Sequence, residues 1–156
     1  PKPAPKPKPA PPPEPELVIR EAKPADAKAL AELIVALGYD VTPLDIRRRL
    51  ALLEGGGQQA LVAEKGKLVG AVTIAETAVL HRPRPVGRLT LLVVAEEARG
   101  KGIGKALVGE AANRLKARGC GLLEVTSNMK RLRAHGFYER LGFERTSYRF
   151  MRKLAD

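Results

Sequence analysis

Hydrophobic and polar residues follow one another along the chain with two different periods, which predict helices in some segments and strands in others. Apolar residues three and four positions apart, such as Leu30, Ile34 and Leu37, are typical of one helix face. Short apolar runs bounded by Gly, Pro or charged residues predict strands. The predicted strands cover residues 17–20, 58–64, 67–80, 89–94, 120–126 and 143–153. The predicted helices cover residues 24–37, 43–54, 102–118 and 130–141.

The order of these elements, β-α-α-β-β-β-α-β-α-β, predicts a mixed α/β (α+β) fold with helices on both faces of a twisted sheet. The tight turn at Lys65-Gly66 separates two strands, so we expect an antiparallel hairpin there. The strand at 89–94, the helix at 102–118 and the strand at 120–126 form a strand–helix–strand unit. Such a unit predicts a parallel pair joined by a right-handed crossover.

A glycine-rich, basic segment lies between the apolar strand at 89–94 and the helix that follows it. Glycine lets the backbone come close to a ligand, because no Cβ stands in the way. A helix start adds N–H groups without intrahelical partners and the positive end of the helix dipole. The segment therefore predicts a binding site for a phosphate or pyrophosphate. It consists of Arg99, Gly100, Lys101, Gly102, Ile103, Gly104 and Lys105.

Two common phosphate-binding motifs do not fit this segment. A P-loop needs G-x-x-x-x-G-K-[ST], but Lys105 stands where the second Gly should follow Gly100. A Rossmann loop needs G-x-G-x-x-G directly after a strand, and neither Gly100 nor Gly102 begins that spacing. Glu124 follows at about 20 residues, as a ribose-binding acid would. This single match does not restore the motif.

The pattern R-x-x-G-x-G, formed by Arg99, Gly102 and Gly104, resembles the acetyl-CoA loop of the GNAT acetyltransferases. A second match follows in the right order, since residues 134–143 resemble the A-x-x-F-Y-E-x-x-G-F ending of that family. The likeness covers residues 17–152. It implies a sheet of about six to seven strands with about four helices. It also implies acetyl-CoA as the co-substrate, bound where the central strand and the next one splay apart.

The resemblance assigns cofactor contacts to three places. The amides from Gly100 to Lys105 would bind the pyrophosphate. The backbone of Leu92, Val93 and Val94 would pair with the pantetheine amides as an added strand does, and would polarise the thioester carbonyl. Asn128 would hydrogen-bond the pantetheine or phosphate arm. A local turn or helix cap is the alternative for Asn128, because Asn is common at such positions for local reasons.

The resemblance also implies Tyr138 as the general acid, because a phenol with a pKa near 10 can give its proton to a leaving thiolate. Packing in the core is the alternative for this side chain. The general base is less well defined, because residues 88–94 contain no acid where many family members carry a Glu. Glu76 on the preceding strand is our first candidate. The other candidates are His81, Glu96, Glu97 and a chain of water molecules.

Residues 1–16 differ in composition from the rest of the chain. Proline occupies nine of these sixteen positions, and the others are Lys, Ala and Glu. Such a stretch favours extended polyproline II and acts as a spacer or tether. We therefore expect a flexible tail at 1–16 and an acetyltransferase domain at 17–156. The first residue is Pro rather than Met, as expected of a processed product, an engineered piece or a fragment of something longer.

The charge and composition bear on partners and location. The chain has 28 Lys+Arg and 17 Asp+Glu, a net charge of +11, which favours anionic partners. Aromatic residues are only 4%, too few for the stacking platforms that bind single strands, so we do not expect nucleic acid as the main ligand. No apolar run of about 18 residues could span a membrane. The single Cys excludes an intrachain disulfide and suits the cytoplasm, and Cys and His are too few for a metal site.

We therefore expect an N-acetyltransferase that moves an acetyl group from acetyl-CoA to a primary amine by direct attack in a ternary complex. The acceptor is a small-molecule or protein amine, held by the first two helices and the loop at 81–85. A homodimer is compatible with this interpretation, as is a tail that tethers the domain to a partner. Two alternatives stay open: a non-catalytic acyl-CoA-binding module and a basic nucleic-acid-binding domain.

Overall fold

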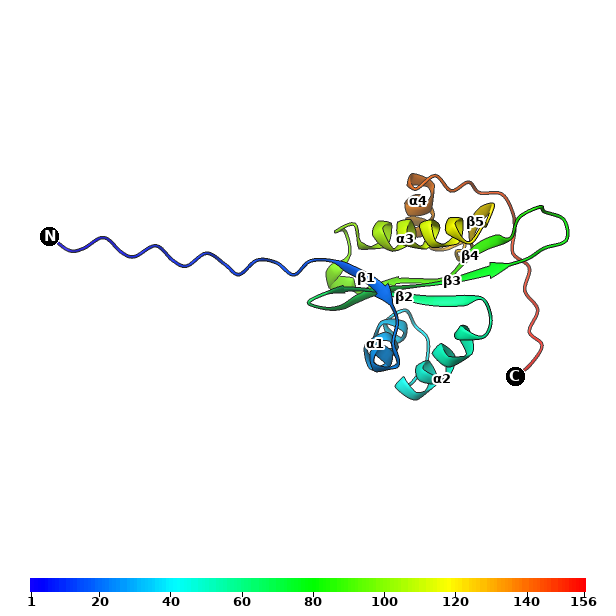
Figure 1. Cartoon of the computed structure of the whole chain (residues 1–156), viewed down its shortest axis with the longest axis horizontal. Helices are drawn as coiled ribbons and strands as arrows, with labels where there is room; N and C mark the ends of the chain where they lie inside the picture. Colours follow the sequence, from blue (N-terminus) through cyan, green and yellow to red (C-terminus); the bar gives the residue numbers. More distant parts are fainter.

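One mixed sheet of five strands lies between two layers of helices in the computed structural model, which describes residues 1–156 (Figure 1). The strands are β1 (Val18–Glu21), β2 (Gln58–Lys65), β3 (Lys67–Thr77), β4 (Val86–Val94) and β5 (Leu122–Val125). They lie side by side in chain order. The pairs β1–β2, β2–β3 and β3–β4 are antiparallel, and β5 is parallel to β4. The expected hairpin and the expected parallel pair are therefore both confirmed.

Four α-helices cover the sheet, two on each face (Figure 1). Helices α1 and α2 lie together on one face, where α1 packs on β3 and β4 and α2 packs on β2. Helices α3 and α4 lie on the other face. The helices are α1 (Ala27–Ala36), α2 (Pro43–Glu54), α3 (Ile103–Ala117) and α4 (Leu132–Arg140), with 3-10 turns at Pro24–Asp26 and Glu96–Ala98.

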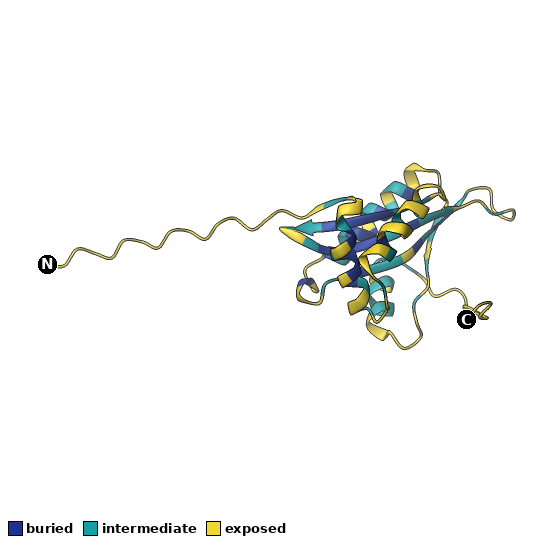
Figure 2. Cartoon of the chain, turned by 90° about the horizontal axis from the view of Figure 1, so that it is seen from below, coloured by how far each residue is buried: buried dark blue, intermediate teal, exposed yellow.

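The alternation of side chains in the strands produces one apolar core on each face of the sheet. Buried stretches of the strands and helices are dark blue in Figure 2. The core on the α3 face includes Val72, Ile74 and Leu107, all fully buried. The core on the α1 face includes Leu30 and Val62. Because both faces of the central strands are buried, these strands appear in the sequence as nearly continuous apolar runs.

The prediction of six to seven strands is wrong, because residues 143–153 form no strand. Gly142, at φ +90°, turns the chain out of α4, and the Phe143 amide closes the helix by donating to the Tyr138 carbonyl. The chain then runs without regular structure, and Tyr148 and Phe150 are 83% and 93% exposed instead of packed. An alternating sequence becomes a strand only where a neighbour supplies ladder hydrogen bonds, and no strand of the sheet pairs with residues 143–153.

Helix α2 begins with a capping box. Thr42 Oγ1 accepts a hydrogen bond from the Asp45 amide at 3.1 Å, and Asp45 Oδ2 accepts one from the Thr42 amide at 2.9 Å. We expect Thr42→Ala to lower the free energy of unfolding by about 1 kcal/mol, because the first turn loses a partner for its amide. Urea unfolding measures this. Thr146→Ala is the matched control, since Thr146 is exposed in the irregular C-terminal segment. Equal stability of the two variants would contradict the capping role.

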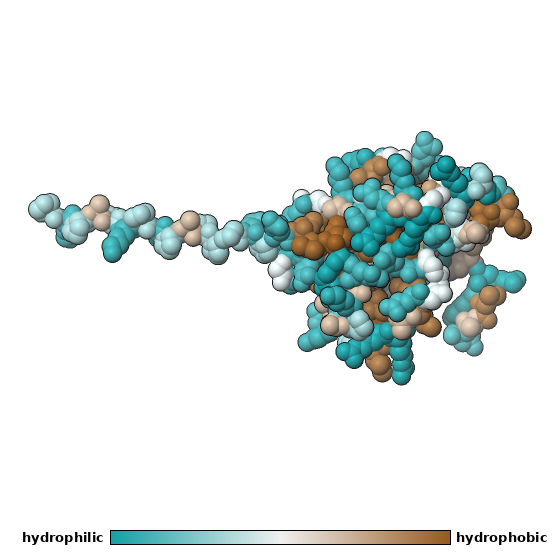
Figure 3. All heavy atoms as spheres, viewed as in Figure 1, coloured by the Kyte–Doolittle hydropathy of each residue, from teal (hydrophilic) through white to brown (hydrophobic).

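Residues 1–17 form no helix or strand and project from the body as an extended segment (Figure 1). The surface of this segment is hydrophilic over most of its length (Figure 3). Its last part lies against the β2–β3 turn, where Glu14 pairs with Lys65 at 3.6 Å and Pro15 lies beside Gly66. None of the helices has the length and apolarity needed to cross a membrane.

Candidate active site

Strand β4 contains a bulge at Thr90. Thr73 of β3 pairs with Leu91 and the next residue, Ile74, pairs with Leu89, so Thr90 has no partner in the ladder. Its hydroxyl lies 2.5 Å from the Thr73 hydroxyl. The extra residue shifts the alternation of side chains by one, so that the residues after the bulge face the opposite side of the sheet from the one expected. Leu89 packs in the core on the α3 face, whereas Leu91 packs in the core on the α1 face.

Beyond this bulge, one edge of β4 is free. The parallel ladder between β4 and β5 pairs only residues 86–89 with residues 122–125. Residues 91–94 still pair with β3 on the other side. A free strand edge presents N–H and C=O groups that can pair with an extended ligand. This edge includes Leu92, Val93 and Val94, whose backbone we expected to bind pantetheine.

The glycine-rich segment at the start of α3 follows the free edge after a single 3-10 turn, Glu96–Ala98. Gly100 and Gly102 have φ of +77° and +79°, a left-handed conformation that other residues rarely adopt. Gly102 is the N-cap of α3, and no side chain caps the free amides there. A Cβ built on Gly100 or Gly102 would meet no atom within 4 Å. The backbone at this helix start is therefore open to a ligand, as a phosphate site requires.

The other residues of this segment divide into structural and exposed side chains. Ile103 is buried in the core on the α3 face, so its side chain anchors the first turn of α3. Arg99 Nε donates to the Val94 carbonyl at 3.3 Å and holds the loop to the end of β4. Lys101 and Lys105 are exposed. Their ammonium groups add positive charge at the positive end of the helix dipole.

Gly104 connects this segment to α4. A Cβ on Gly104 would lie 3.3 Å from Phe137 Cζ and 3.7 Å from Val94 Cγ2. The neighbouring Tyr138 packs edge-to-face against Phe137 and Phe143, with ring centroids 5.2 Å and 5.4 Å apart. The structure thus places Phe137, the residue before the candidate acid, against the glycine-rich segment close to the end of β4.

The environment of Tyr138 favours its protonated form. Burial of the half-buried ring raises the pKa of the Tyr138 hydroxyl above its usual value, while the nearby Arg131 acts weakly in the opposite direction. The phenol therefore carries its proton at neutral pH. A general acid must be protonated before the reaction, and Tyr138 meets that requirement.

Asn128 forms a local turn after β5. Its Oδ1 accepts a hydrogen bond from the Lys130 amide at 2.9 Å, as in an Asx turn. Its carbonyl accepts one from the Arg131 amide at 3.0 Å and lies 2.8 Å from His135 Nε2. The local role considered from the sequence is therefore present. These bonds occupy the Asn128 oxygens and leave its side-chain amide nitrogen for a ligand.

Glu76 lies away from the glycine-rich segment. It pairs with Gly87, where a Cβ would come within 2.8 Å of Leu115 Cδ1, so both residues face α3 near its C-terminal end. Glu76 lines a surface pocket of about 520 Å³ that Arg118 also lines. Seven residues of β4 separate Gly87 from Val94, about 23 Å at about 3.3 Å per residue. The structure does not bring Glu76 to the glycine-rich segment.

The remaining candidates for the base are more exposed. His81 lies in the loop between β3 and β4, and its side chain is exposed. Glu96 and Glu97 form part of the 3-10 turn after β4. Glu97 pairs with Lys67 at 3.2 Å, and its own backbone amide and Lys67 lower the pKa of its carboxyl.

A polar strip on the α1 face of the sheet was missed by the sequence reasoning. Arg88 donates to Glu124 Oε1 at 3.2 Å and to Thr126 Oγ1 at 3.0 Å. Both partners lie on β5 or just after it, at the point where β5 leaves β4. The signal was the alternation of polar residues in both strands, which places them on one face. The strip consists of Thr73, Arg88, Thr90, Glu124 and Thr126.

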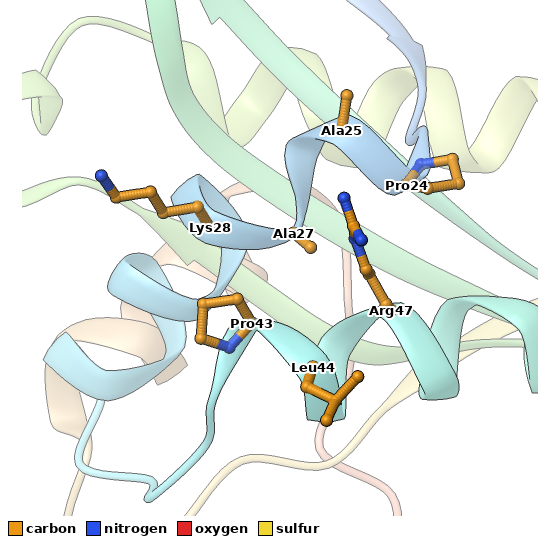
Figure 4. A pocket seen from close by; sticks show the side chains of 7 residues that line it. All are labelled: Pro24, Ala25, Ala27, Lys28, Pro43, Leu44 and Arg47. Atoms are coloured by element: carbon orange, nitrogen blue, oxygen red, sulfur yellow. The ribbon is translucent and has the colours of Figure 1, made fainter.

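The first two helices, which we expected to hold the acceptor, enclose a pocket of about 200 Å³ between their N-terminal ends. Figure 4 shows Arg47 rising from α2 toward the turn at Pro24 and Ala25, while Lys28 points away. Arg47 therefore lines the pocket between the first two helices. No residue of β4 or of the glycine-rich segment lines it.

Comparison with known proteins agrees with this arrangement. The model of the Acetyltransferase (GNAT) family matches residues 28–143. A putative acetyltransferase from Agrobacterium tumefaciens is 26% identical, with a TM-score of 0.80, and the match covers 88% of this chain and 99% of that one. A Trypanosoma brucei acetyltransferase is 25% identical, with a TM-score of 0.77 and coverage of 89% and 100%. A transcriptional regulator from Bacillus halodurans is 25% identical, with a TM-score of 0.79 and coverage of 89% and 100%. No curated protein matches the chain in sequence.

Proposed function

Because the chain belongs to the GNAT acetyltransferase family, we propose that it is an N-acetyltransferase that moves an acetyl group from acetyl-CoA to a primary amine. The reaction is direct attack of the amine on the thioester within a ternary complex. Acetyl-CoA supplies the activated acetyl group, and the chain supplies the groups that hold it and move protons.

One observation carries this proposal: the free edge of β4 is followed, after one 3-10 turn, by a helix start that no side chain caps. Residues 92–94 have no strand partner on the β5 side. Gly100 and Gly102 keep space open above the first amides of α3. The pantetheine arm of CoA carries two amides and is joined to a pyrophosphate, so an extended backbone edge followed by an anion site matches the chemistry of CoA.

The side chains near the β4 edge and the start of α3 have the remaining roles. Lys101 and Lys105 supply exposed positive charge for phosphates, and the side-chain nitrogen of Asn128 hydrogen-bonds the pantetheine arm. Tyr138 gives its proton to the leaving thiolate. A β4 amide beyond the bulge polarises the thioester carbonyl. Glu76 stays a sequence prediction for the base, and its place on the α3 face of the sheet, opposite the polar strip, is the main argument against it.

The tail and the location complete the proposal. Residues 1–16 act as a spacer that tethers the domain to a partner, since they are exposed and rich in proline. We place the protein in the cytoplasm, where its free thiol at Cys120 stays reduced.

Thiol release tests this function. The purified chain is incubated with acetyl-CoA and, in turn, with glucosamine 6-phosphate, kanamycin and a peptide with N-terminal Ala. We expect amine-dependent release of CoA thiol with at least one of the three, and the acetylated amine in the mass spectrum. Tight binding of acetyl-CoA without release would favour the non-catalytic acyl-CoA-binding module. Binding of a labelled duplex that falls steeply with salt would favour the nucleic-acid-binding domain.

A further inference from the structure

We propose that Glu124 is the group that takes the proton from the acceptor amine, an inference that rests on the acetyltransferase function proposed above. Glu124 lies on β5, level with Arg88 of β4, one residue before the ladder between the two strands ends. Its carboxylate therefore stands at the mouth of the gap in which the thioester would lie.

The position of Glu124 on the sheet distinguishes it from Glu76. Leu123 and Val125 pack against the core on the α3 face, so Glu124 between them faces the α1 side. Thr90 projects on that side too, where it meets the Thr73 hydroxyl. Glu76 faces α3 on the opposite side of the sheet. An amine that approaches the gap over the polar strip therefore meets Glu124 and not Glu76.

The distance along the sheet is suitable. Glu124 is level with Arg88, two residues before the bulge at Thr90. At about 3.3 Å per residue, the separation along the strand is about 7 Å. The Glu124 carboxylate and a thioester carbonyl polarised just beyond the bulge would then lie on either side of the acceptor nitrogen. The nitrogen can then touch both groups.

Arg88 positions this carboxylate. Its guanidinium binds Glu124 Oε1 at 3.2 Å and Thr126 Oγ1 at 3.0 Å, which orients the Glu124 side chain through one oxygen. The second oxygen, Oε2, has no partner in the protein, and the side chain is 50% exposed. Glu124 can therefore accept a hydrogen bond from an ammonium group while Arg88 holds it in place.

The proton balance of the reaction gives Glu124 a defined step. The ammonium gives one proton to Glu124, which passes it to water. The free amine attacks the carbonyl carbon, so that the C–N bond forms and the C–S bond breaks. The thiolate takes the proton of Tyr138. The second proton of the nitrogen returns through water to Tyr138, and one proton in total is released to solvent.

The test compares Glu124→Gln with the wild type, using the amine of the three above that gives the fastest thiol release. We expect kcat to fall about 100-fold. Acetyl-CoA affinity, measured by calorimetry, should stay within twofold, and Glu124→Asp should recover part of kcat. Calorimetric titration of the same amine into the protein with CoA should show weaker binding to Glu124→Gln. Glu110→Gln is the matched control, because Glu110 pairs with Arg114 on the surface of α3.

The outcomes separate this inference from the proposed function. Unchanged turnover in Glu124→Gln, with wild-type release intact, overturns the inference alone. Loss of turnover in Glu76→Gln but not in Glu124→Gln does the same and returns the role to Glu76. No amine-dependent release by the wild type with any of the three amines overturns the proposed function, and this inference with it.

Discussion

Replacement of Tyr138 by Phe should lower kcat about 100-fold, the usual size of the contribution from one general acid. The hydroxyl is the only group removed, and the ring contacts with Phe137 and Phe143 remain. We therefore expect the thermal midpoint and the acetyl-CoA affinity of Tyr138→Phe to match those of the wild type. Steady-state thiol release measures kcat, and calorimetry measures the affinity.

Tyr148→Phe is the matched control for this variant. It removes the same hydroxyl from a ring that is exposed in the C-terminal segment, so turnover should not change. If Tyr138→Phe kept full turnover, Tyr138 would be a packing residue, as its aromatic contacts alone would permit. The thiolate would then take its proton from water.

Replacement of Gly102 by Val should weaken acetyl-CoA binding by tenfold or more. Gly102 has φ +79°, and a left-handed conformation costs an L-residue about 1–2 kcal/mol. A valine there relaxes the loop out of the left-handed conformation, and ligand binding must restore it. A cost of about 1.4 kcal/mol in the free energy of binding is already tenfold in affinity. The new side chain would also occupy the open space beside the first amides of α3. Titration with acetyl-CoA measures the change.

Gly109→Val controls for the added side chain in the same helix. Gly109 lies within α3, is exposed, has no positive φ, and a Cβ there would meet no atom within 4 Å. We expect this variant to bind acetyl-CoA like the wild type. Equal affinity of Gly102→Val and Gly109→Val would show that the helix start does not bind the pyrophosphate.

Local patterns predicted the part of the fold that local chemistry determines. The turn at Lys65-Gly66 needs a positive φ, which Gly66 adopts at +76°, so the hairpin was visible in the sequence. The glycine-rich segment was visible for the same reason. The segment at 143–153 has the alternation of a strand, but its pairing depends on a neighbour, which no local pattern specifies.

The candidate site, like the fold, was predictable from the sequence where it depends on local chemistry. The spacing of Arg99, Gly102 and Gly104 indicated the loop, because their chemistry is local. The bulge at Thr90 was not visible, since it depends on how β3 and β4 pair. The alternation in each strand indicates a polar face, but the pairing of β5 with β4 brings Glu124 beside Arg88. This pairing is a long-range contact, and so the polar strip with Glu124 could not be assembled from the sequence alone.

Calorimetric titration of the folded chain with acetyl-CoA, with NAD and ATP in parallel, tests the central claim most directly. The free edge of β4 and the open start of α3 predict binding of acetyl-CoA at micromolar strength or better, and much weaker binding of the other two. The pantetheine arm, which NAD and ATP lack, supplies the difference through the β4 backbone. Absence of acetyl-CoA binding, or equal binding of all three, would contradict the account.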